Sequence, residues 1–175
     1  MSNKKRSTFF TGAVDASKVP GFSLGTTMVG FASIAKEAGL DVWSTTTTTL
    51  VVWGLPGQVA FVSLLSTGAS LIFIFIAVCL ANMRMMLMVI SAHDILQLKS
   101  FEISIFKKIL LMHLLAITSW AQLGHARQKY GRKLLLIYYV GFSITIYLFG
   151  LSGTLIGYHL DNFIPRDIML FVVFI

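Results

Sequence analysis

Long apolar stretches separated by short polar turns dominate the hydropathy pattern of the chain. Three of them, residues 19–35, 69–90 and 134–158, are strongly apolar, and two others, residues 43–66 and 109–123, contain more polar positions. A helix needs roughly 20 residues to cross a hydrocarbon core of about 30 Å. None of these stretches alternates between apolar and polar residues as membrane strands do. The pattern therefore predicts an all-α, polytopic integral membrane helix bundle with five spans.

The regions outside the predicted spans are short. Residues 1–18 are expected to form a basic cytoplasmic N-terminal segment, and residues 19–175 a transmembrane domain. Residues 91–108 mix apolar and charged side chains, which is typical of a helix that lies at the membrane interface. The chain ends with an apolar stretch, residues 168–175, which is too short to cross a bilayer.

The second apolar stretch is interrupted in its middle by the sequence Gly54-Leu55-Pro56-Gly57-Gln58. Lipid cannot satisfy backbone groups that a break sets free, so such a break is buried in protein or lines a cavity. In secondary transporters, discontinuous helices aim these groups at the substrate. We therefore predict non-helical backbone at residues 55–57 and a substrate site formed by Gly54, Pro56, Gly57 and Gln58. A kink that serves packing alone is the alternative.

Polar residues elsewhere in the predicted spans are further candidates. Asn82 and Arg84 lie within the third span, where an arginine costs about 2.5–3.5 kcal/mol and usually has a partner. Because its guanidinium fork suits a carboxylate, Arg84 is expected to point inward and to bind substrate together with Asn82. The alternatives are extension of Arg84 to the headgroups and a purely structural ion pair. Residues 44–49, all serine or threonine, are expected to bond back to their own helix.

The charge balance is that of a membrane protein. The mean hydropathy is +0.81 and only 12% of the residues are charged, whereas about a quarter are charged in a soluble domain. The net charge of +7 could suggest nucleic acid as a partner, but the basic residues gather where the spans end. One group lies in residues 4–6 and another in residues 125–133. This distribution follows the positive-inside rule and does not form a nucleic-acid-binding stripe.

The same two basic groups predict the orientation. If both are cytoplasmic, an even number of crossings lies between them. Four crossings meet this condition if the Gly-Pro-broken stretch crosses the membrane completely. The lysines of the connector, Lys99, Lys107 and Lys108, then face outward.

Motifs for catalysis or for cofactor binding are missing from the sequence. The single cysteine, Cys79, lies in an apolar stretch, and the seven acidic residues fall mostly in loops. No metal-ligand cluster, nucleophile–base pair or phosphate-binding loop is recognisable. We expect no catalytic residues, no metal and no cofactor, and a protein that is not an enzyme.

Several of these segments resemble the AzlC family, the large subunit of bacterial branched-chain amino acid exporters. They are the sequence GFASIAKEAGL at residues 30–40, the break closed by Gln58, the Asn82-x-Arg84 pair and GTLIG at residues 153–157. The resemblance implies a secondary transporter subunit that exports branched-chain or similar small apolar amino acids. It also implies the bacterial cytoplasmic (inner) membrane and a small AzlD-type membrane subunit as partner, with membrane lipid around both.

The resemblance is incomplete in the fourth apolar stretch. Family members usually carry a threonine followed by acidic residues there, whereas this chain has Thr118-Ser119-Trp120. A carboxylate that could couple protons or hold the substrate amine is therefore missing. A non-transporting or degenerate membrane scaffold subunit is the alternative function.

Overall fold

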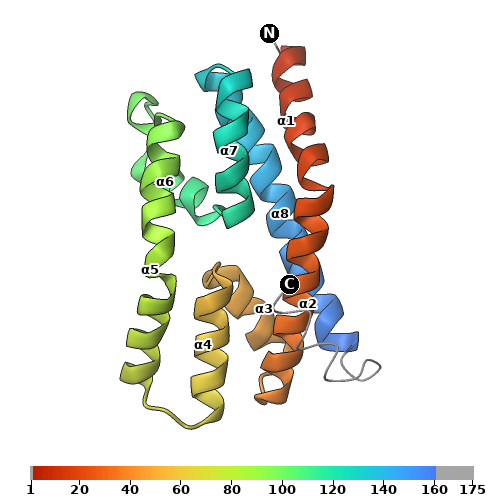
Figure 1. Cartoon of the computed structure of the whole chain (residues 1–175), viewed down its shortest axis with the longest axis vertical. Coiled ribbons are helices and arrows are strands. Elements are labelled where there is room, and N and C mark those ends of the chain that lie inside the picture. The colour runs from red at the N-terminus through yellow and green to blue at the C-terminus, as the bar shows by residue number, and fades with distance from the viewer. Residues whose placement is uncertain (1, 161–175) are drawn as a thin grey trace. The chain divides into compact units, whose positions relative to one another are not determined.

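The computed structural model describes residues 2–160, and all secondary-structure elements in this part of the chain are helices (Figure 1). The predicted all-α class is therefore confirmed. The apolar stretch at residues 168–175 lies outside the described residues. The elements are α1 (Ser2–Ala16), α2 (Val19–Glu37), α3 (Val42–Val51), α4 (Leu55–Ser66), α5 (Leu71–Ile95), the 3₁₀ helix η1 (Leu98–Ser100), α6 (Ile105–His113), α7 (Ile117–Lys129) and α8 (Arg132–Leu160).

Two of the described helices are long and apolar enough to cross a membrane. They are α5, with 25 residues, and α8, with 29 residues, and they coincide with the predicted third and fifth spans. Both extend beyond the predicted bounds, because α5 continues to Ile95 and α8 begins at Arg132. Only 6% of the most apolar part of α5 is buried inside the chain.

The described residues fall into two compact units. Unit 1 contains residues 2–21 and 85–147, and unit 2 contains residues 22–84 and 148–160. Each unit contains one interrupted pair of helices, α6–α7 in unit 1 and α3–α4 in unit 2. The expected N-terminal segment is helical over Ser2–Ala16, while its cytoplasmic position and a domain boundary at residue 18 stay predictions.

In unit 2, α2 and α8 pack backbone against backbone. A Cβ atom on Gly153 would collide with the backbone of Gly25, and one on Gly157 would collide with the backbone of Val29. Glycines four residues apart allow such close approach of helices in lipid, where no hydrophobic force draws two apolar helices together. The GTLIG sequence therefore has a packing role.

In unit 1, glycines join α1 to α8 in the same manner. A Cβ atom on Gly12 would meet the backbone of Tyr138 and Phe142, and one on Gly141 would meet the backbone of Phe9. The N-terminal residues therefore form a helix that packs closely on α8.

A polar network strengthens this contact. Gln122 Nε2 donates to Tyr138 Oη at 2.8 Å, and Tyr138 Oη donates to Asp15 Oδ2 at 3.0 Å. Burial raises the pKa of Asp15, but hydrogen bonds from Lys18 and Tyr138 outweigh it, so the pKa lies below its ordinary value. Asp15 therefore accepts these bonds as a carboxylate at neutral pH.

The predicted fourth span, residues 109–123, is not one continuous helix. The helix ends at His113, and α7 begins at Ile117 with a change of direction of 107°. Ser119 stabilises the new helix start, because its Oγ accepts from Ala116 N at 2.8 Å and donates to Ala116 O at 2.9 Å. Ser100 precedes α6 and Arg132 follows α7, and Arg132 Nη2 donates to Ser100 O at 3.5 Å. After α7 the chain therefore returns to the segment from which α6 started.

This return changes the charge argument. If α2 and α5 cross, as the sequence predicts, and residues 105–129 do not, an even number of crossings between the two basic groups requires that α3–α4 does not cross either. In that arrangement the basic groups no longer require a complete crossing of the Gly-Pro segment, and the complete crossing stays a prediction. If both helix pairs, α3–α4 and α6–α7, return to the side of the membrane from which they start, Lys99, Lys107 and Lys108 lie on the same side as the other basic residues.

We predict the topology that follows from this argument. In a Cys79→Ser background, single cysteines at Ser100 and Gln128 should react with an impermeant maleimide from the cytoplasmic side. Cysteines at Glu37 and Thr67 should both react from the outside. All four positions are exposed within the described chain.

A cysteine at Asn3 serves as the control for the side of the N-terminus. Reaction of Glu37 and Thr67 from opposite sides would mean that α3–α4 crosses the membrane. Reaction of Ser100 and Gln128 from opposite sides would mean the same for α6–α7.

Candidate functional site

The break in the second apolar stretch lies at residues 52–54. Helix α3 begins at the N-cap Asp41, whose carboxylate accepts from Trp43 N at 3.2 Å and Ser44 N at 3.3 Å. Helix α4 begins at Leu55 with Pro56 in its first turn. The non-helical backbone therefore precedes the predicted residues 55–57, because a proline suits the first turn of a helix, where its missing N–H has no role.

Helix α4 turns back toward α3 after the break. Gln58 Nε2 donates to Thr49 Oγ1 at 3.2 Å. In a continuous helix two residues nine positions apart are separated by about 13.5 Å along the axis, too far for this bond. The segment is a pair of half-helices that meet at their broken ends.

A buried chain of polar side chains holds these half-helices to α8. Thr49 Oγ1 lies 3.1 Å from Thr154 Oγ1, and Thr154 Oγ1 donates to Gly150 O at 3.0 Å. The side chains of Thr49, Gln58 and Thr154 are completely buried. Hydrogen bonds at such a depth have few competitors, so this chain fixes the position of Gln58.

Sequence reasoning missed Thr49 and Thr154 as members of this site. The prediction for residues 44–49 holds for Thr45, Thr46 and Thr48, whose hydroxyls donate to carbonyls one turn earlier. Thr49 differs because it also contacts a hydroxyl 105 residues away. The spacing from Thr49 to Gln58 across a glycine-proline break is the one signal that could have suggested their contact.

Asn82 from α5 fills the space left by the two glycines of the break. A Cβ atom on Gly54 would lie 2.5 Å from Asn82 Oδ1, and one on Gly57 would lie 2.6 Å from Asn82 Cγ. Real Cβ atoms do not approach so closely, so glycine is required at both positions while the carboxamide lies there. The structure thus brings together Gly54, Pro56, Gly57, Gln58 and Asn82, five of the six predicted residues.

Two hydrogen-bond acceptors at this point have no partner within the described residues. They are Gln58 Oε1 and Asn82 Oδ1, and both atoms are buried. A buried acceptor without a partner costs about 1–3 kcal/mol. Both oxygens belong to side chains around the first turn of α4, whose backbone N–H groups lack partners within the helix. The arrangement offers acceptors for a cation beside a helix start that attracts an anion.

Arg84 is not part of this enclosed arrangement. Its side chain is exposed within the described chain. Residues two positions apart on a helix differ by about 200° in direction, so Arg84 faces away from the break toward which Asn82 points. The expected inward position of Arg84 is not found, and its role in substrate binding stays a prediction.

These features define an integral membrane protein with a discontinuous helix and an enclosed polar site, an architecture used for transport. A family model described as AzlC protein matches residues 21–164. The chain therefore belongs to the AzlC family, which is associated with amino acid transport. Comparisons with curated proteins and with solved structures found no match.

We predict that Gly57→Ala destabilises the protein because the new methyl group displaces the Asn82 carboxamide. The overpacking cost of about 1–3 kcal/mol should exceed the gain of about 1 kcal/mol that alanine brings in a helix. Thermal unfolding in detergent measures this loss.

Gly124→Ala is the matched control, because no heavy atom lies within 4 Å of its added Cβ atom. It should leave the melting temperature unchanged or raise it. Asn82→Ala should relieve the defect of Gly57→Ala, so that the double variant is more stable than the sum of the single losses allows. If Gly57→Ala lowers the melting temperature equally in the wild-type and the Asn82→Ala background, the proposed contact is contradicted.

Proposed function

We propose that the chain is a secondary transporter subunit that exports branched-chain or similar small apolar amino acids across the bacterial cytoplasmic membrane. The observation that carries this proposal is a pair of buried oxygens at the start of α4, Gln58 Oε1 and Asn82 Oδ1, that have no hydrogen-bond partner among residues 2–160. Membership of the AzlC family supports the transport of amino acids.

The charges of an amino acid match this arrangement. An ammonium group donates up to three hydrogen bonds, and two carboxamide oxygens can accept two of them. A carboxylate is stabilised by the N–H groups and the dipole at a helix start. Gly54 and Gly57 have no side chains, so the substrate can approach the backbone there.

Apolar side chains around the break support a small apolar substrate. Leu55 and Val59 from α4 pack against a buried cluster that includes Met28, Phe31 and Val62. The described residues of this cluster carry no charge, which disfavours an acidic or basic substrate side chain. Leucine, isoleucine and valine are therefore the proposed substrates.

The proposed partner is a small AzlD-type membrane subunit. Helix α5 supports this part of the proposal, because it is strongly apolar and only 6% of its most apolar part is buried by this chain. A second subunit on α5 would cover this surface and would also cover the exposed Arg84.

We predict substrate efflux from liposomes that contain the purified chain together with its small subunit. Preloaded radiolabelled leucine, isoleucine and valine should leave faster than lysine or aspartate. Omission of the small subunit should reduce the flux. A folded chain that moves none of these substrates, with or without its partner, would support the scaffold alternative.

Gln58→Leu tests the site itself. Loss of one hydrogen bond to a charged group is worth about 1.5–3 kcal/mol, so the apparent affinity for leucine should fall about 10- to 150-fold. Gln128→Leu makes the same change at an exposed position and should leave efflux unchanged. If both variants fold and are equally active, transport does not depend on the site at the α3–α4 break.

A further inference from the structure

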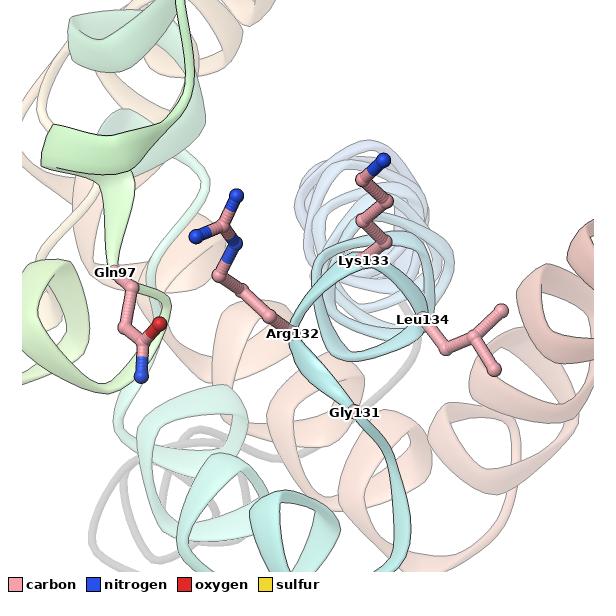
Figure 2. A pocket seen from close by; sticks show the side chains of 5 residues that line it. All are labelled: Gln97, Gly131, Arg132, Lys133 and Leu134. Atoms are coloured by element: carbon pink, nitrogen blue, oxygen red, sulfur yellow. The ribbon is translucent and has the colours of Figure 1, made fainter.

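A second site lies in unit 1, in a groove beside the start of α8. The groove lies between the segment after α5 and the first turn of α8, and it is lined by Gln97, Gly131, Arg132, Lys133 and Leu134. Figure 2 shows the Arg132 side chain extending toward the segment that carries Gln97, while Leu134 points to the opposite side. We call this feature, together with its continuation, the basic groove.

The continuation of the basic groove adds a further cation and one carboxylate. It shares Gln97 and Arg132 with the first part and is also lined by Asp94, Arg127 and Tyr130. Asp94 has His93 Nδ1 at 3.5 Å from its carboxylate. The two parts together are lined by three cationic side chains and one carboxylate, so the groove is positively charged.

The arginine at the centre of the groove is held in position, and no carboxylate of the described residues pairs with it. The Arg132 guanidinium carbon lies 4.8 Å from the centre of the Phe101 ring, and Nη2 donates to Ser100 O. Among residues 2–160, the ion pairs do not include Arg132, Arg127 or Lys133. A positioned guanidinium with free donors suits a phosphate, which it can bind through two parallel hydrogen bonds.

The backbone adds to this preference. Gly131, Arg132, Lys133 and Leu134 form the entry and first turn of α8, a helix of 29 residues. The N–H groups of such a turn lack partners within the helix and favour anions. The cations of the groove supply the independent attraction that a helix start alone does not provide.

The position of the basic groove identifies the source of the phosphate. Helices α5 and α8 are the described helices that are apolar and long enough to cross a membrane, and the groove lies where α5 ends and α8 begins. This is the level of the lipid headgroups, where basic pockets between membrane helices bind anionic lipids. Tyr130 in the groove is a residue type typical of that level.

We infer that the basic groove is a specific binding site for the phosphate of an anionic lipid headgroup. The inference is independent of the proposed transport function. It concerns unit 1, whereas the candidate substrate site lies in unit 2.

Native mass spectrometry of the full chain in detergent tests this site, with phosphatidylglycerol and phosphatidylcholine as probes. The wild-type chain should retain phosphatidylglycerol preferentially. The double variant Arg132→Gln with Lys133→Gln should lose this preference, with affinity reduced about fivefold for each charge removed. Lys4→Gln with Lys5→Gln removes the same charge from an exposed part of α1 and should retain it.

Inorganic phosphate separates the two possible sources of the anion. It should not displace phosphatidylglycerol at millimolar concentration. Displacement by phosphate, or equal lipid loss in both double variants, would overturn the assignment. If the groove variant does not fold, Arg127→Gln on the exposed surface of α7 repeats the test, and unchanged phosphatidylglycerol binding there would also overturn it.

Discussion

The α3–α4 break must be covered by protein, and the arrangement of unit 2 depends on this constraint. Each backbone group left open to hydrocarbon costs several kcal/mol. The chain meets the constraint with two carboxamides: Asn82 lies against Gly54 and Gly57, and Gln58 bonds to Thr49. These contacts fix three helices around one point. The groups that prevent an open break are thus the groups that could bind a substrate.

Much of the remaining packing depends on helix α8, because different faces of this helix contact different helices. Gly153 and Gly157 lie one turn apart and meet α2 backbone to backbone, while Thr154, about 100° further around the helix, meets Thr49 of α3. Close glycine packing replaces the hydrophobic force that is absent between helices in lipid. Movement of α8 within unit 2 would therefore disturb both a packing contact and the hydrogen bonds that position Gln58.

The sequence predicted the helical class, the two longest spans and five residues that meet at the break. It placed the break too late because Pro56 was taken as the interruption, whereas proline starts α4. It missed the α6–α7 bend because no glycine or proline marks that position and Ser119 stabilises it through a local hydrogen bond. The different directions of Asn82 and Arg84 could have been predicted, since residues two apart cannot share one helix face.

If the chain exports amino acids as proposed, a neutral binding site suits the release step. In the proposed complex, two carboxamide oxygens accept from the substrate ammonium, each worth about 1.5–3 kcal/mol, and the helix start adds about 0.3–1 kcal/mol for the carboxylate. Association costs at least about 4 kcal/mol, so the net affinity is modest. A carboxylate at the position of Asn82 Oδ1 would bind the ammonium more strongly and would leave a buried charge after release. Neutral carboxamides avoid this cost.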